Sequence, residues 1–117
     1  LLVVVKDPSE TDAAVKALSQ AFTGQITAMK SNPTYIEVIH LGVSKGAALL
    51  ALAAQRGIRA EEIMALGDSN NDLSMLRAAG LGVAMGNAMA DVKAAADVVT
   101  ADCEAGGLAA AVRQYVL

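Results

Sequence analysis

The sequence has few of the residues that hold together small secreted or metal-stapled proteins. Its 117 residues include one cysteine, Cys103, two prolines, no tryptophan and only 3% aromatic residues. A single cysteine excludes an internal disulfide, and the lack of a Cys-x-x-Cys pair or a Cys/His cluster argues against a zinc site. This pattern is typical of a reducing compartment, so we expect a cytoplasmic protein.

Long apolar runs and an excess of positive charge are also missing. The longest apolar runs, residues 1–5 and 46–54, fall well short of the ~20 residues that a membrane span needs. The net charge is −3 with 18% charged residues, which suits neither a basic nucleic-acid module nor a disordered tail. We therefore expect neither a membrane nor a nucleic acid as a partner.

Apolar residues make up 55% of the chain, and in the first forty residues their periodicity predicts a β-α-β-β layout. A strand is expected at residues 1–5, followed by a helix with Ser9 as its N-cap. Two further strands are expected at residues 25–30 and 34–39. Because a tight turn joins these last two strands, they should pair antiparallel.

Beyond residue 43 the pattern changes to short helices and strands in alternation, which is typical of a parallel sheet covered by helices. Helices are expected at residues 45–56, 70–79, 88–96 and 108–116, and strands at residues 63–67, 81–85 and 98–100. Four methionines on apolar positions are expected to fill the core, at Met64, Met75, Met85 and Met89. The chain should thus have two parts, residues 1–41 and a larger Rossmann-like part, residues 42–117.

The stretch Gly-Asp-Ser-Asn-Asn-Asp at residues 67–72 is the first candidate site. It follows an apolar strand and opens a helix, so Asp68 should lie at the carboxyl end of a strand, where open α/β sheets bind ligands. A carboxylate there suits Mg²⁺, and Asn71 would lie at a helix start, where N–H groups attract anions. Acidic residues are also ordinary helix starters, so spacing alone leaves both interpretations open. An EF-hand is excluded, since Leu73 replaces its glycine.

Lys45 is the second candidate. It is expected in the first turn of a helix capped by Ser44, where the helix dipole disfavours a cation, so its ammonium group needs an anionic partner. A lysine in this position can hold a phosphate and a carboxylate together. A solvated surface lysine is the alternative. The nearby glycines do not have the spacing of a phosphate-binding Walker loop.

Several segments match one protein family in both order and spacing. They are Gly-Val-Ser-Lys-Gly at 42–46, Gly-Asp-Ser-Asn-Asn-Asp at 67–72, Met-Leu at 75–76, Ala-Gly at 79–80, Val-Ala-Met-Gly-Asn-Ala at 83–88 and Ala-Asp-Val-Val-Thr at 96–100. Together they strongly resemble the Cof-type phosphatases of the haloacid dehalogenase superfamily. The first thirty residues look like the end of that family's α/β cap. The resemblance implies an α/β fold, namely a partial Rossmann-like core with a parallel sheet, preceded by a β-α-β-β cap fragment.

The resemblance also implies a function, that of a Mg²⁺-dependent phosphatase acting on small phosphorylated metabolites, such as sugar phosphates, through a phosphoaspartyl intermediate. Lys45 looks like the family's catalytic lysine, which bridges the nucleophilic aspartate and the phosphate. Asn71 is similar to its hydrogen-bond donor to the phosphate, and Asp68 to the Mg²⁺ ligand from the second half of the site. Asp72 resembles the acid that orients these groups. Phosphoryl transfer asks a protein mainly for positioning and charge neutralisation, which suits these roles.

One part of the family's pattern is missing. The Asp-x-Asp-Gly-Thr motif that supplies the nucleophile and the general acid/base is not present, and neither Asp7 nor Asp102 stands in its place. The chain also opens directly on an apolar strand, so we expect the carboxyl-terminal part of a longer phosphatase, inactive alone. The alternative is a short non-catalytic binding or assembly module that retains the half-fold and pairs with another chain. An exposed sheet edge would then favour self-association.

Overall fold

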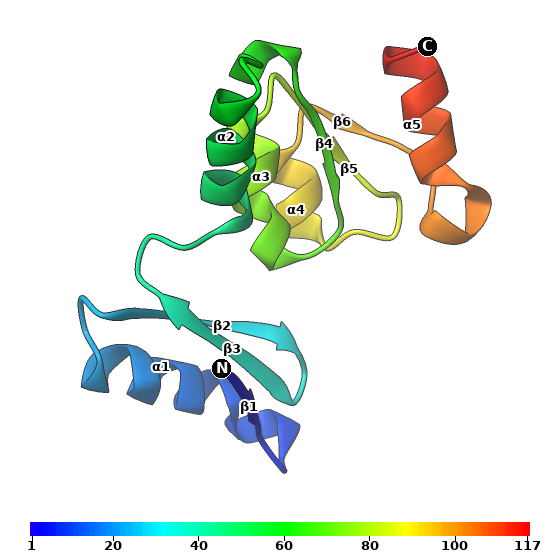
Figure 1. The fold of residues 1–117 in the computed structure, drawn as a ribbon. Helices are drawn as coiled ribbons and strands as arrows, with labels where there is room; N and C mark the ends of the chain where they lie inside the picture. Colours follow the sequence, from blue (N-terminus) through cyan, green and yellow to red (C-terminus); the bar gives the residue numbers. More distant parts are fainter. The chain divides into compact units, whose positions relative to one another are not determined.

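The computed structural model describes residues 1–117, which form two units, Leu1–Val43 and Ser44–Leu117 (Figure 1). Strands and helices follow one another in nearly the predicted order, and the second unit contains a parallel sheet. The predicted α/β fold class is therefore confirmed. None of the helices combines the length and the apolar character needed to cross a membrane.

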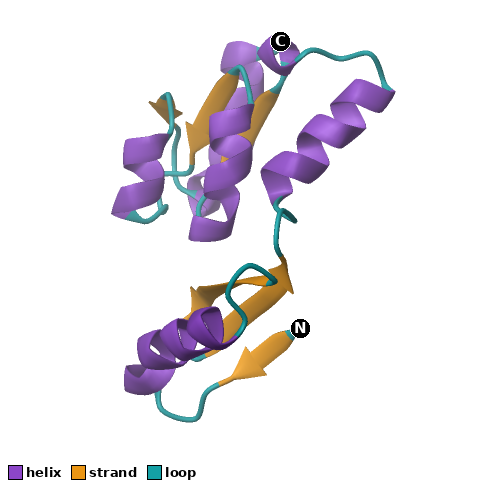
Figure 2. Cartoon of the chain, turned by 90° about the vertical axis from the view of Figure 1, so that its left-hand side faces the viewer, coloured by secondary structure: helices purple, strands orange, loops and turns teal.

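The first unit is an antiparallel sheet with one helix packed on a face of it (Figure 2). Its strands, in the spatial order β1-β3-β2, are Leu2–Val4, Tyr35–His40 and Ile26–Asn32. The helix α1, Thr11–Ala21, buries Thr11, whose hydroxyl donates to the carbonyl oxygen of Pro33 at 2.6 Å. On the sheet, Ile36 is fully buried. The antiparallel pairing expected for the last two strands is present.

The predicted helix cap at Ser9 is wrong. A 3-10 turn, Pro8–Glu10, precedes α1, and the carboxylate of Asp7 accepts a hydrogen bond from the Ser9 N–H at 2.9 Å. Proline fits the first position of a helical turn because its φ angle is already helical and it has no N–H to satisfy. The capping residue is therefore the one before Pro8, and the cap moves from Ser9 to Asp7.

The second unit is a three-stranded parallel sheet with helices on its faces. Its strands, in the order β4-β5-β6, are Met64–Gly67, Leu81–Ala84 and Val98–Val99. Its helices are α2 (Lys45–Gln55), α3 (Leu73–Ala78), α4 (Ala90–Ala95) and α5 (Gly107–Tyr115). Figure 1 shows α2, α3 and α4 on one side of this sheet and α5 on the other.

The core of this unit lies between α3, α4 and the strands. Leu76 and Val92 are its fully buried large side chains, packed with the small side chains of Ala65, Ala84 and Ala88. The helix predicted at residues 70–79 starts instead with a 3-10 turn, Asn70–Asp72, before α3. Met89 is 54% exposed, so its predicted place in the core is wrong.

Candidate phosphate and metal site

The loops that follow the three parallel strands meet at one edge of the sheet. Asp68 comes directly after β4, Asn87 three residues after β5, and Cys103 four residues after β6. Because the strands are parallel and in register, with Gly67 opposite Ala84, their carboxyl ends point the same way. This is the edge at which open α/β sheets bind ligands.

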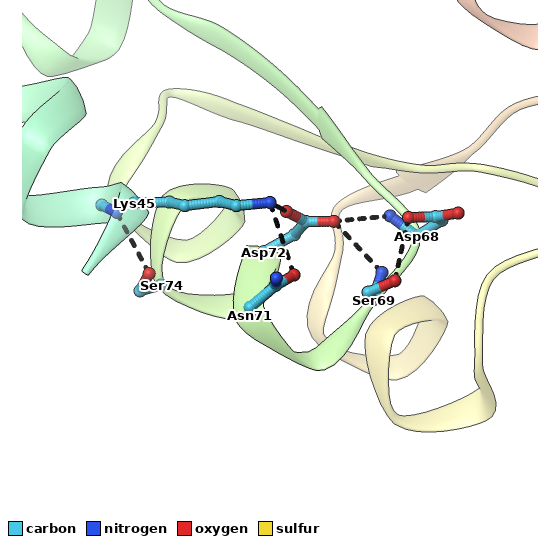
Figure 3. A network of polar contacts seen from close by, with 7 residues as sticks. Lys45, Asp68, Ser69, Asn71, Asp72 and Ser74 are labelled. Carbon is cyan, nitrogen blue, oxygen red and sulfur yellow. Dashed lines mark hydrogen bonds and ion pairs between the residues drawn. The ribbon is translucent and has the colours of Figure 1, made fainter. Parts of the chain in front are cut away.

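Lys45 reaches this edge from the start of α2. Ser44 caps that helix, since its hydroxyl accepts a hydrogen bond from the Ala47 N–H at 3.1 Å. The Nζ atom of Lys45 forms an ion pair with Oδ1 of Asp72 and lies 3.4 Å from Oδ1 of Asn71 (Figure 3). The cation at the helix start thus has the anionic partner that its unfavourable position calls for.

Two glycines allow these side chains to come so close. A Cβ atom on Gly46 would lie 2.3 Å from the carbonyl oxygen of Ser74, so only glycine lets α2 approach α3 this closely. The Gly46 N–H also donates to the Ser74 hydroxyl at 3.0 Å. A Cβ atom on Gly67 would lie 2.4 Å from the Cβ of Asp72. Glycine at these two positions therefore brings Asp72 between β4 and Lys45.

Asp72 is the central group of the network. Its side chain is only 6% exposed, and its Oδ2 atom accepts hydrogen bonds from the backbone N–H groups of Asp68 at 3.0 Å and Ser69 at 3.1 Å. Burial raises the pKa of Asp72, but the Lys45 hydrogen bond and charge and the two backbone donors together outweigh it, so the pKa lies below its ordinary value. Asp72 is therefore an anion that fixes both Lys45 and the loop carrying Asp68.

Asp68 and Asn71 keep free binding capacity. The carboxylate of Asp68 is exposed, and its two oxygens accept one hydrogen bond each, from the Ser69 hydroxyl at 3.1 Å and the Asn87 amide at 3.4 Å. Each carboxylate oxygen has a second lone pair, which suits a hard cation. The Nδ2 group of Asn71 makes no hydrogen bond within the chain and can donate to an anion.

The structure gathers all four predicted site residues, Lys45, Asp68, Asn71 and Asp72, into one network within the second unit. Sequence reasoning missed Ser74 and Asn87. No sequence pattern pointed to Ser74, because its hydrogen bond to Gly46 depends on how closely α2 and α3 approach. A sequence pattern did point to Asn87. It lies in the segment 83–88, which matches the family, and it follows the strand predicted at residues 81–85.

With this geometry established, comparison with known proteins identifies the family. The model of the haloacid dehalogenase-like hydrolases matches residues 1–112. The chain therefore belongs to the haloacid dehalogenase-like hydrolases. Several of its relatives are named as phosphatases, which confirms the resemblance to the Cof-type phosphatases of this family.

Three relatives illustrate the similarity. The 5-amino-6-(5-phospho-D-ribitylamino)uracil phosphatase YcsE of Bacillus subtilis is 49% identical over 87 residues, 74% of this chain and 35% of YcsE. The putative phosphatase YxeH of the same organism is 34% identical over 116 residues, 99% of this chain and 43% of YxeH. The structure of the subclass IIB sugar phosphatase BT4131 is 36% identical with a TM-score of 0.83, covering 90% of this chain and 40% of BT4131. The chain thus spans less than half of each relative.

Proposed function

We propose that this chain supplies the second half of the active site of a Mg²⁺-dependent phosphatase that hydrolyses small phosphorylated metabolites, such as sugar phosphates, through a phosphoaspartyl intermediate. The aspartate nucleophile would come from sequence outside the 117 residues. In this proposal residues 1–41 are the end of an α/β cap and residues 42–117 the carboxyl-terminal half of the core. The substrate class is supported by BT4131, a sugar phosphatase, and by YcsE, whose substrate carries a phosphoribityl group.

The observation that carries this proposal is the placement of Lys45 beside Asp72 and Asn71, next to an exposed Asp68. The ammonium group of Lys45 would neutralise charge on the phosphate and hold it against the nucleophile. The free Nδ2 group of Asn71 would donate to a phosphate oxygen. Because both groups are held in place before the substrate arrives, they stabilise the charge that spreads over the phosphoryl oxygens without reorganisation.

The donor set at Asp68 fits Mg²⁺. This ion usually takes one or two carboxylates together with waters and phosphate oxygens, and Asp68 offers one exposed carboxylate at the correct edge of the sheet. When bound, Mg²⁺ would supply Lewis-acid activation of the phosphoryl group. Asp72 would act indirectly, by holding Lys45 and the backbone of Asp68 in position.

The first prediction concerns a hybrid enzyme. The segment of YxeH that matches this chain is replaced by residues 1–117, so that YxeH supplies the rest of the protein. We expect the hybrid to hydrolyse p-nitrophenyl phosphate with Mg²⁺, and the 117-residue chain alone to give no turnover. The measurement is the release of p-nitrophenol by each purified protein.

Asp68→Ala in the hybrid is the matched control, because it removes the metal-binding carboxylate and should abolish turnover. A folded hybrid without activity would contradict the proposal. So would strong turnover by the 117-residue chain alone that disappears with Asp68→Ala, since the nucleophile would then lie within this chain.

A second candidate, an assembly module that pairs with another chain, is favoured by the open edge of β4. Within the sheet β4 pairs only with β5. The carbonyl groups of Ile63 and Gly67 accept hydrogen bonds from the strand beside them, so the backbone groups of Met64 and Leu66 point to the other side. An unpaired strand edge of this kind recruits a partner strand.

The second prediction follows from this edge. We expect the 117-residue chain to self-associate with rising concentration in sedimentation velocity, and Met64→Pro to weaken the association by removing one edge N–H. Ile63 already has φ −104° and ψ 130°, a conformation that a following proline allows. Met64→Thr keeps the N–H and should still associate. A monomer at all concentrations with cooperative unfolding would contradict this prediction.

A further inference from the structure

Asn87 is the polar side chain of the segment 83–88, and the proposed function gives it no task. Its Nδ2 atom lies 3.4 Å from Oδ2 of Asp68, and its Oδ1 atom accepts a hydrogen bond from the Cys103 N–H at 2.9 Å. Asp68, Asn87 and Cys103 follow β4, β5 and β6 respectively. One amide side chain therefore joins the loops after all three parallel strands.

The two contacts fix which way the amide group faces. A backbone N–H can only donate, so the atom of Asn87 next to Cys103 must be the carbonyl oxygen. The NH₂ group must then face Asp68, whose ionised carboxylate can only accept. The orientation of the amide thus follows from the chemistry of both neighbours.

The loop that holds Asn87 is itself tightly packed. The Gly86 N–H donates to the carbonyl oxygen of Ala101 at 3.0 Å. A Cβ atom on Gly86 would lie 2.2 Å from Oδ1 and 2.7 Å from the backbone nitrogen of Asp102. Since the two loops touch at the level of their backbones, the Cys103 N–H is a fixed anchor for Asn87.

We propose that Asn87 is a positioning residue for Asp68, which turns the carboxylate so that its free lone pairs face the metal ion. This inference rests on the proposed function, because it takes Asp68 as the Mg²⁺ ligand. Hydrogen-bond partners that orient a ligating carboxylate commonly contribute about 10–100-fold to metal affinity. Asn87 contacts the carboxylate through one NH₂ group, so the lower end of that range applies.

The third prediction is tested on the 117-residue chain by following its amide NMR signals during a MgCl₂ titration. We expect the wild-type chain to bind weakly, with the Asp68 and Ser69 signals shifting, because only one protein carboxylate is available. Asn87→Ala should weaken this binding about tenfold. Asn70→Ala is the matched control, since Asn70 is exposed in the same loop as Asp68 and its side chain makes no hydrogen bond within the chain; it should bind as the wild type does.

A second pair of variants removes the anchor instead of the side chain. Cys103 begins the 3-10 turn Cys103–Ala105, and the preceding Asp102 has φ −62° and ψ 157°. Proline fits the first position of such a turn after an extended residue. Cys103→Pro therefore deletes the N–H that holds Asn87, whereas Cys103→Ala keeps it. We expect Cys103→Pro to weaken Mg²⁺ binding and Cys103→Ala to leave it unchanged.

The outcomes separate this inference from the proposed function. If the wild-type chain binds Mg²⁺ at Asp68 while Asn87→Ala and Cys103→Pro bind it equally well, the role of Asn87 is wrong and the proposed function stands. If MgCl₂ moves no signal around Asp68 in the wild-type chain, the metal role of Asp68 is wrong and the inference falls with it. If Asn87→Ala fails to unfold cooperatively, the two Cys103 variants decide.

Discussion

Replacing Asp72 by asparagine should lower the unfolding free energy of the second unit by about 2–3 kcal/mol at neutral pH, because a buried charged acceptor is lost. Asp72 serves two sets of donors, with Oδ1 facing Lys45 and Oδ2 facing the N–H groups of Asp68 and Ser69. Asparagine has only one oxygen. If that oxygen faces the backbone, its NH₂ group meets the Lys45 ammonium group, and two donors oppose each other.

The measurement is a urea titration followed through the amide NMR signals of β5, which report on the second unit alone. Glu62→Gln is the matched control within the same unit. Glu62 pairs with Arg59 at 3.2 Å, but the two side chains are 50% and 75% exposed, so its loss should change stability little. An Asp72→Asn variant as stable as the wild type would show that the buried carboxylate does not stabilise the second unit.

The stability difference between wild type and Asp72→Asn should depend on pH in one direction only. Because the pKa of Asp72 is lowered on folding, its stabilising contribution is fully present above the unfolded-state value of about 3.9. The contribution is lost as the pH falls through the lower pKa of the folded state. We therefore expect a constant difference at neutral pH that shrinks below about pH 4. A difference that grew on acidification would contradict the lowered pKa.

The sequence could predict which edge of the sheet carries the site, since residues 67–72 follow an apolar strand. It could also predict that Lys45 needs an anionic partner. It could not say which carboxylate that partner is. The predicted α-helix from residue 70 begins after Asp68 and gives no reason for Asp72 to contact the backbone of Asp68. The 3-10 turn Asn70–Asp72 instead folds Asp72 back beneath the N–H of Asp68.

The contacts that sequence reasoning missed depend on tertiary packing. Asn87 meets Asp68 only because Gly67 and Ala84 are paired in the parallel sheet, and it meets Cys103 only because Gly86 lets two loops touch. Neither the strand register nor the loop approach can be obtained from local periodicity. The exposed Met89 shows the same limit, since an apolar residue near a helix start need not face the core.

Replacing Lys45 by methionine in the YxeH hybrid should lower kcat about 10²–10³-fold, the size of effect expected when one preorganised donor to the transition state is removed. Methionine keeps the length and the apolar stem but has no charge. The phosphoryl oxygens would then lose a neutralising group, and Asp72 would lose its ion-pair partner. A separate Lys45→Arg hybrid should also have low activity. Its planar guanidinium group cannot replace the compact ammonium group between Asp72 and Asn71.

Lys93→Met in the hybrid is the matched control, since Lys93 lies on α4 in the same unit and forms no ion pair, so its loss should leave kcat unchanged. Thermal unfolding of each variant shows whether lost activity is lost folding. A Lys45→Met hybrid that stays folded and keeps its kcat would mean that Lys45 serves only as the counter-ion of Asp72. Because the charge on the phosphoryl oxygens would then have to be neutralised from elsewhere, the proposed role of Lys45 in the active site would be wrong.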